Sequence, residues 1–211
     1  MLLDDIKQAI RKKVMKLPKE IVFATNNAHK LQEVREIVGS DCRVLSLAEI
    51  GCHDDIPETA DTIEGNALLK ARWVKERYGY DCFADDTGLE VDALGGAPGV
   101  RSARYAAQEG GADHDSQANM RLLLRHMEGN TDRRARFRTV MALILGGEEH
   151  LYEGKVEGTI TEGPRGNDGF GYDPVFLPRG ERRPFAEMSA DEKNSLSHRR
   201  RALDAMLAAL S

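Results

Sequence analysis

The stretch IVFATNNAHKLQEVREIV, residues 21–38, contains two hydrophobic periodicities separated by a polar turn. Residues 21–24 form a short apolar run bounded by Thr and Asn, which is typical of an interior strand. The second half brings four apolar residues onto one face of a helix: Leu31, Val34, Ile37 and Val38. The stretch therefore predicts a buried strand that leads through a polar turn into an amphipathic helix.

The polar turn, residues 25–30, has the groups of an anion site. The first N–H groups of a helix lack intrahelical partners and lie at the positive end of the helix dipole, so a phosphate binds well there. Thr25 and Asn27 add side-chain donors, and Lys30 adds a positive charge. A strand cap followed by an Asn-rich turn is the alternative interpretation.

Strands and helices alternate from this stretch up to Leu94. Residues 42–47 are predicted as a second strand, the segment that ends at Gly79 as a helix, and DCFADD, 81–86, as a short strand that ends in two carboxylates. One face of the predicted helix carries Ile63, Ala67, Lys70, Ala71 and Val74. The alternation predicts a layered α/β fold with a partly parallel central sheet.

Beyond Leu94 the chain is punctuated by Gly and Pro, and we predict a second lobe. Its predicted elements are a helix, an antiparallel hairpin with a Gly-Gly-Glu-Glu turn, an irregular segment and a closing amphipathic helix, at 116–129, 134–160, 163–176 and 195–210 respectively.

The composition indicates a globular protein, since 41% of the 211 residues are hydrophobic and 31% are charged. A formal charge of -5 argues against broad nucleic-acid binding, and no apolar run approaches the roughly 18 residues of a membrane span, so we expect neither partner. Three cysteines without paired metal spacing predict free thiols and a cytoplasmic location. Residues 1–18 are interpreted as an N-terminal extension, with a docked helix as the alternative, and residues 19–211 as the domain.

The adjacent carboxylates Asp85 and Asp86 are placed by this pattern at the carboxyl end of a strand, where α/β sheets bind ligands. Neighbouring residues on an extended chain point to opposite sides, so the two carboxylates are expected to differ in role. One can face a metal and a water while the other holds backbone N–H groups. An Asx-turn without further function is the alternative.

Two further patterns suit a nucleotide. Glycines on both sides of Phe170 free an aromatic face for stacking on a planar base, worth roughly 1–3 kcal/mol, although a loop anchor packed on the core is the alternative. Ser189 and Glu192 have capping-box spacing, and Ser195 or Ser197 could start the last helix. Lys193, His198 and Arg199 cluster near that helix start, where their donors could read base carbonyls or phosphate oxygens. A solvated helix face is the alternative.

Several common catalytic motifs are missing from the sequence. TNNAHK is not a Walker loop, no G-x-G-x-x-G follows the first strand, and no G-x-S-x-G or Cys–His pair indicates acyl transfer. What remains is a phosphate turn, a carboxylate pair suited to magnesium, an aromatic platform and a cationic cluster. That set of roles indicates a nucleotide hydrolase.

In this order the segments TNNAHK, ETADTIEGNALLKA, FADDTGLEVDALGGAPGVRSARYA, GFGYDPVF and EKNSLSHR resemble the Ham1/RdgB family of inosine triphosphate pyrophosphatases. The resemblance runs from about residue 21 to residue 210. It implies an ITPase-like (Maf/Ham1) α/β fold, in which a long mixed sheet flanked by helices forms two lobes with a central cleft, and usually a homodimer.

The resemblance also implies roles for individual residues. Asp86 corresponds to the proton acceptor and a magnesium ligand, while Glu58 is the better match to the second metal carboxylate and Glu64 the weaker one. The implied substrate-binding residues are Thr25, Asn27, Lys30, Thr87, Phe170, Gly171, Tyr172, Asp173, Lys193, His198 and Arg199. The sequence departs from the family pattern at Asn26, which replaces a frequent Gly, and at Arg101, which replaces a frequent Tyr.

The activity implied by the resemblance is Mg²⁺-dependent hydrolysis of ITP, dITP or XTP to the monophosphate and pyrophosphate, with Mn²⁺ as a substitute, which removes deaminated purines from the nucleotide pool. One alternative is a Maf-like pyrophosphatase that prefers modified or pyrimidine nucleotides. Another is a nucleotide-binding sensor without turnover, against which the presence of both Asp86 and Lys30 argues.

Overall fold

The computed structural model describes residues 18–40 and 42–210. The predicted N-terminal extension lies outside the described residues except for residue 18. The helices are α2 (Ala28–Val38), α3 (Ile63–Tyr78), α4 (Ser116–His126), α5 (Ala190–Leu196) and α6 (His198–Ala209). The strands are β1 (Glu20–Phe23), β2 (Arg43–Leu45), β3 (Cys82–Val91), β4 (Pro98–Gly99), β5 (Arg134–Leu145), β6 (Glu148–Ile160) and β7 (Phe176–Pro178). Within the described ranges, no helix is both long and apolar enough to span a bilayer.

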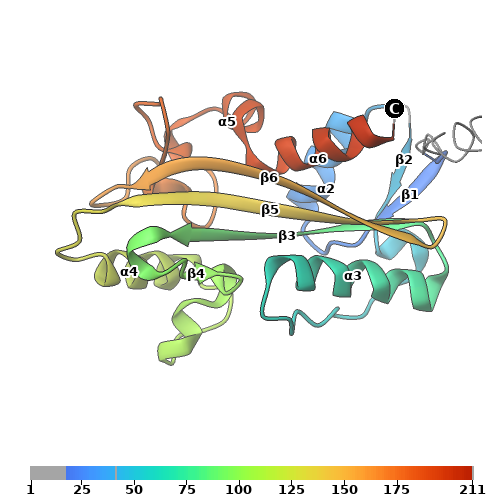
Figure 1. Cartoon of the computed structure of the whole chain (residues 1–211), viewed down its shortest axis with the longest axis horizontal. Coiled ribbons are helices and arrows are strands. Elements are labelled where there is room, and N and C mark those ends of the chain that lie inside the picture. The colour runs from blue at the N-terminus through green and yellow to red at the C-terminus, as the bar shows by residue number, and fades with distance from the viewer. Residues whose placement is uncertain (1–17, 41, 211) are drawn as a thin grey trace, which may run out of the picture.

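A single mixed sheet organises the described residues. Its strand order is β2-β1-β3-β5-β6-β7, and β4 pairs with β3 beside this path. β1 is parallel to β2 and β3, whereas the long strands β3, β5 and β6 are antiparallel to one another. The predicted α/β fold with a partly parallel sheet is therefore confirmed, and the long strands run across the whole molecule (Figure 1).

Helices cover both faces of the sheet at the end where β1 and β2 lie (Figure 1). α3 packs on one face through an apolar cluster that includes Ala67, Ala71 and Val140, and α2 and α6 pack on the other through a cluster that includes Val34 and Leu203. Burial of these stripes follows the helical periodicity of the sequence. The predicted apolar faces of α2 and α6 are thus confirmed.

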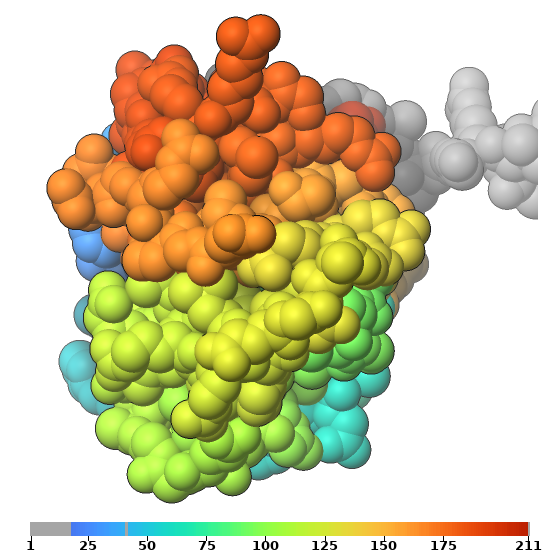
Figure 2. Space-filling view, turned by 90° about the vertical axis from the view of Figure 1, so that its left-hand side faces the viewer, coloured from blue at the N-terminus to red at the C-terminus, as the bar shows by residue number. Residues whose placement is uncertain are grey.

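A third apolar cluster lies at the other end of the long strands. It joins α4 to the ends of β3, β5 and β6 and includes Leu89, Leu123, Phe137 and Phe176. Figure 2 views this end, where the segment of α4 and the loops around β7 and α5 form two halves of the surface. The two predicted lobes are therefore the two ends of one sheet, and the prediction that the second lobe begins after Leu94 was wrong because the long strands belong to both.

Two predicted boundaries differ from the structure. The strand expected to end at Asp86 continues to Val91, because β5 pairs with it along its whole length, from Cys82 opposite Ile144 onward. The hairpin between β5 and β6 has a two-residue Gly-Gly turn, since Leu145 pairs with Glu148, so the two glutamates expected in the turn belong to β6. In both places cross-strand pairing, rather than local composition, sets the end of the strand.

The central strand β3 has a gap in its pairing on one edge. β1 pairs with it only as far as Phe83, and β4 joins only at Leu89. Between these points residues 85–88 pair with β5 on their other edge alone, among the residues that the structure describes. This interruption in the middle of the sheet lets a ligand approach the backbone and side chains of β3, so the carboxylates lie beside a gap within the strand and not at its end.

Close contact between β6 and α6 yields a stability prediction. A Cβ atom added at Gly154 would lie 2.1 Å from the His198 carbonyl oxygen and 2.3 Å from the Ala202 nitrogen, both backbone atoms that cannot rotate away. We expect Gly154→Ala to lower the free energy of unfolding by about 1–3 kcal/mol through overpacking, measured by chemical denaturation. Gly163→Ala, where a Cβ meets nothing within 4 Å, is the matched control. Equal stability of the two variants would contradict the packing argument.

Candidate active site

A cleft of about 1580 Å³ opens at the gap in β3. Apart from Glu64, the weaker match to the second metal carboxylate, every residue to which the sequence resemblance assigned a role lines the cleft: Thr25, Asn27, Lys30, Glu58, Asp86, Thr87, Phe170, Gly171, Tyr172, Asp173, Lys193, His198 and Arg199. These residues come from the turn after β1, the loop before α3, the middle of β3, the loop before β7, and α5 and α6. The fold thus brings together polar residues that are as many as 174 positions apart in the sequence.

The turn after β1 combines both interpretations of its sequence. Asn27 is the N-cap of α2, and its Oδ1 accepts hydrogen bonds from the backbone N–H groups of His29 and Lys30. The side-chain oxygen is therefore used by the helix and not by a ligand, although the turn still borders the cleft. Asn26 does not adopt a positive φ, so the replacement of the frequent Gly causes no strain in this turn.

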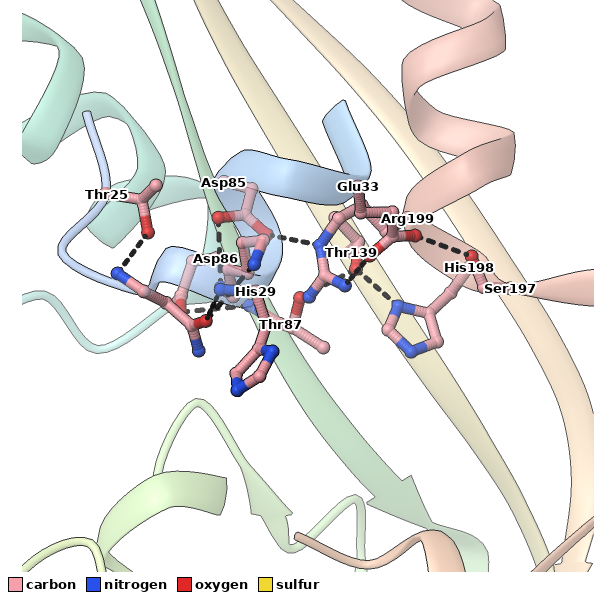
Figure 3. Close-up of polar contacts among 12 residues, drawn as sticks. Thr25, His29, Glu33, Asp85, Asp86, Thr87, Thr139, Ser197, His198 and Arg199 are labelled. Atoms are coloured by element: carbon pink, nitrogen blue, oxygen red, sulfur yellow. Dashed lines mark hydrogen bonds and ion pairs between the residues drawn. The ribbon is translucent and has the colours of Figure 1, made fainter. Parts of the chain in front are cut away.

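Asp85 is the centre of a buried ion-pair network on the α2 and α6 side of the sheet (Figure 3). Its Oδ1 lies 2.9 Å from Lys30 Nζ, and its Oδ2 lies 3.1 Å from Arg199 Nε. Arg199 also binds Glu33, with 2.8 Å between Nη1 and Oε2. Burial alone would raise the pKa of Asp85, but the charges of Lys30 and Arg199 outweigh it and hold that pKa far below its usual range. Asp85 remains ionised and fixes both cations at the cleft.

Asp86 points to the opposite face, as expected for the neighbouring residue on a strand. Its Oδ2 accepts a hydrogen bond from Asn66 Nδ2 at 3.3 Å, and its Oδ1 lies 4.0 Å from Lys70 Nζ. Lys70 Nζ also lies 2.5 Å from Glu58 Oε1, so two carboxylates converge on one cationic group. Burial, reinforced by the charge of Glu58, raises the pKa of Asp86 to about 6 despite the attraction of Lys70. The predicted division of roles between the two aspartates therefore has a structural basis, except that Asp85 holds cations and not backbone N–H groups.

The carboxylates at the cleft could contribute to a site for a divalent cation. No group of three or more His, Cys, Asp or Glu side chains that could hold a metal occurs in the described part of the chain. Asp86 and Glu58, however, both border the cleft and both lie beside the Lys70 ammonium group. Magnesium is commonly bound by one or two carboxylates, with water and substrate phosphates completing its coordination. The residues present fit such a site, whereas Glu64 does not border the cleft and binds Arg138 instead.

The aromatic platform lies at the surface and not in the core. Phe170 is 54% exposed, so the interpretation of this ring as a core anchor was wrong. Asp173 organises the loop: its Oδ2 accepts hydrogen bonds from the Phe170 backbone N–H at 2.7 Å and from Lys193 Nζ at 2.5 Å. A side chain at Gly169 would collide with the same oxygen, since an added Cβ would lie 2.3 Å from it. Lys193 Nζ lies 4.5 Å from the centroid of the Phe170 ring, so a planar ring and a cation face the cleft together.

The start of α6 is buried, contrary to the interpretation of a solvated helix face. His198 and Arg199 are only 7% and 4% exposed. His198 Nδ1 lies 2.6 Å from Thr139 Oγ1, and the imidazole stacks on Phe137 with 5.0 Å between ring centroids. The pKa of His198 is well below its usual value because the ring is buried and the charges of Arg199 and Lys193 lie near it. The His198 imidazole is therefore neutral at neutral pH.

Sequence reasoning missed several residues of this site. Lys70 was predicted only as part of the buried face of α3. A lysine on a buried helix face indicates a partner of opposite charge, which here is Glu58. Glu33 and Thr139 gave no local signal, because their partners come from α6 and β3, far away in the sequence. Arg101 does not border the cleft, and its Nη1 donates to Gln108 Oε1.

The fold and the cleft together define a class of protein. A mixed sheet whose central strand has a pairing gap at a buried carboxylate, with cations from four helices and an exposed aromatic ring on one cleft, is the arrangement of a nucleotide hydrolase of the α/β class. The model of the Ham1 family matches residues 21–209, and the chain belongs to this family.

Similar proteins cover almost the whole chain. A dITP/XTP pyrophosphatase of Porphyromonas gingivalis is 56% identical over 181 residues, which are 85% of this chain and 91% of that protein. A dITP/XTP pyrophosphatase of Flavobacterium psychrophilum is 50% identical over 188 residues, which are 89% of this chain and 97% of that protein. Among solved structures, the Ham1 protein of Staphylococcus aureus superposes with a TM-score of 0.82 at 38% identity and covers 90% of this chain and 97% of its own.

Proposed function

We propose that this chain hydrolyses non-standard purine nucleoside triphosphates, namely ITP, dITP and XTP, to the nucleoside monophosphate and pyrophosphate. The family and the names of relatives that are 50% and 56% identical support this enzyme class. The observation that carries the proposal is the environment of Asp86, a buried carboxyl whose pKa is raised to about 6. Asp86 lies beside Glu58 and Lys70, and the same cleft is lined by Lys30 and Phe170. A carboxyl with that pKa is suited to accept a proton near neutral pH.

Asp86 is the general base in the proposed reaction. A water attacks the α-phosphorus and gives its proton to Asp86, while the bond from the α-phosphorus to the oxygen that bridges to the β-phosphate breaks. The pyrophosphate leaves with additional negative charge, which the Lys30 ammonium group stabilises from the turn after β1. Asp86 and Glu58 are the residues that would hold Mg²⁺, or Mn²⁺ in its place, and the ion would neutralise charge on the phosphate oxygens.

In this proposal the base binds at the end of the cleft where Lys193 and Phe170 lie. Lys193 presents a donor beside the exposed face of Phe170. Hypoxanthine and xanthine have an oxygen acceptor at position 6, whereas adenine has an amino donor there. A site built from donors rejects a base that presents another donor, because both groups lose their water without forming a bond.

We expect Lys193→Ala to narrow the preference for ITP over ATP by about tenfold, because one donor is lost from the base site. The measurement is the ratio of kcat/KM for the two nucleotides. Arg183→Ala, which removes an exposed cation paired with Glu192 at the same helix, is the control and leaves the ratio unchanged. An unaltered ratio in Lys193→Ala would assign base recognition to other groups.

The pH dependence of the reaction follows from the raised pKa of Asp86. Only the ionised carboxylate accepts a proton or binds a cation, so kcat/KM is expected to fall about tenfold per pH unit below about 6. A cation bound at Asp86 favours the ionised form, so this acid limb moves to lower pH as the metal concentration rises. Profiles at low and high Mg²⁺ test both statements. An acid limb near pH 4 at both concentrations would show that Asp86 is not the titrating group.

The function is tested by turnover of ITP, XTP, dITP, GTP, ATP and dTTP, with pyrophosphate and orthophosphate quantified separately. Pyrophosphate released from ITP, dITP and XTP, with little from the other three, is the expected result. A preference for dTTP favours a Maf-like enzyme, orthophosphate release favours a phosphatase, and binding without turnover favours a sensor. Assembly as a homodimer and a cytoplasmic location stay predictions from the family resemblance.

A further inference from the structure

Three side chains form a hydrogen-bonded chain between β3 and the start of α6 (Figure 3). Thr139 on β5 is its middle member and is fully buried. Its Oγ1 lies 2.7 Å from Thr87 Oγ1 on β3 and 2.6 Å from His198 Nδ1 on α6. Thr87 and His198 border the cleft, whereas Thr139 does not.

The distances favour one direction of donation along this chain. A hydroxyl has one proton, so Thr139 can donate to only one of its two neighbours. Bonds with an N–H donor span about 2.7–3.2 Å, whereas bonds with an O–H donor span about 2.5–3.0 Å. The separation of 2.6 Å between Thr139 Oγ1 and His198 Nδ1 lies in the range of a hydroxyl donor and below that of an N–H donor. In the direction that this separation favours, Thr139 donates to the ring nitrogen and accepts the proton of Thr87.

The direction of the chain sets the tautomer of His198. An imidazole that accepts at Nδ1 carries its single proton on Nε2 when the ring is neutral. His198 Nε2 has no hydrogen-bond partner among residues 18–40 and 42–210, and protein atoms do not enclose it completely. In this tautomer the Nε2–H is a donor available to a ligand, because His198 borders the cleft and its ring is held against Phe137.

We propose that Thr139 is a specificity-determining positioning residue, which holds His198 as a hydrogen-bond donor and so favours purine bases with an oxygen acceptor at the edge that His198 meets. The identity of the base rests on the proposed function, but the tautomer does not. The Nε2–H of His198 can donate to the 6-oxo group of hypoxanthine or xanthine. With adenine it would face the 6-amino group, which is also a donor, so no hydrogen bond forms. Without Thr139 the ring is free to place its proton on Nδ1 and to accept at Nε2, which removes this discrimination.

The first test reads the tautomer directly. Nitrogen NMR of histidine-labelled protein at neutral pH distinguishes a protonated from an unprotonated ring nitrogen, and the His198 signals are assigned by their loss in His198→Asn. We expect the Nε2–H form in the wild type and in Thr139→Ser, which keeps the hydroxyl. Thr139→Val has nearly the same shape without the hydroxyl, and a mixture of both tautomers is expected there.

The second test reads specificity. The ratio of kcat/KM for ITP to that for ATP is expected to fall about tenfold in Thr139→Val and to return toward the wild-type value in Thr139→Ser. A purely structural role would lower the melting temperature of Thr139→Val while leaving tautomer and ratio unchanged, and that result would overturn the inference. A wild-type His198 protonated on Nδ1 would overturn it as well. If the wild type does not turn over ITP, the proposed function fails, while the NMR result still decides the role of Thr139.

Discussion

Replacing Asp86 by Asn is expected to reduce pyrophosphate release from ITP by at least roughly 10²–10⁴-fold, because the amide cannot accept the proton of the attacking water. The same change removes a negative charge from the carboxylate pair that would hold Mg²⁺, so addition of more metal should not restore the rate. The measurement is kcat with saturating ITP at two metal concentrations. A variant that retains near-normal turnover would show that another group is the base.

The same substitution should leave the fold intact. The pKa of Asp86 is raised from 3.8 to about 6, so the folded state holds the proton more tightly than the unfolded state. Ionisation therefore opposes folding: the penalty is absent below about pH 4, grows as pH rises and is complete above about pH 6. It is on the order of 3 kcal/mol at most. We expect metal-free Asp86→Asn to be at least as stable as the wild type at pH 7.5.

Asp204→Asn is the matched control for this pair of measurements. Asp204 lies on the exposed side of α6, with its Oδ1 2.8 Å from Arg200 Nε. Its substitution by Asn is therefore the same chemical change, made away from the cleft. Normal turnover and nearly unchanged stability are expected of it, since exposed ion pairs contribute about 0–1 kcal/mol. A large loss of stability in Asp86→Asn, matched by the loss of activity, would mean that the residue is structural.

Asp85→Ala is expected to have the largest effect on stability, a loss of about 3–5 kcal/mol in the free energy of unfolding. The carboxylate is the shared partner of Lys30 and Arg199, whose side chains are 16% and 5% exposed. Removal of Asp85 leaves both cations without this partner in a poorly hydrated environment. Among the described residues, Arg199 then retains Glu33 as its one ion-pair partner. Chemical denaturation at pH 7.5 measures the loss. Turnover should also fall, because Lys30 is no longer held at the turn after β1.

The pH dependence of this contribution has the opposite sign to that of Asp86. The folded-state pKa of Asp85 is depressed, so its stabilising effect is present above the ordinary carboxyl pKa and is lost as pH falls through the lower folded-state value. The difference in stability between the wild type and Asp85→Ala should therefore shrink in strong acid. Glu149→Ala, which breaks an exposed pair with Arg72, is the control with an expected cost of about 0.2–1 kcal/mol. Equal costs for the two variants would refute the buried network.

Local pattern predicted much of the fold because it depends on side-chain periodicity. The strand and helix of residues 21–38, the helix that ends at Gly79 and the long hairpin were confirmed, since apolar spacing of 2 or 3.6 residues must match the face that is buried. The ends of β3 and the boundary of the lobes were predicted wrongly. Both depend on which strands pair, and β3 continues past Asp86 only because β5, about 50 residues later, pairs with it.

The same distinction applies to the site. The sequence by itself determined the chemical groups, the opposite directions of Asp85 and Asp86 and the glycines around Phe170, because each follows from chain geometry over a few residues. The tertiary structure alone decided the partners. Lys70 became a cleft cation by facing Glu58, Arg199 became a buried anchor by reaching Asp85, and Thr139 became the partner of His198 when α6 packed over β5. The charge and proton positions of these groups depend on neighbours and burial, which arise only when distant segments pack together.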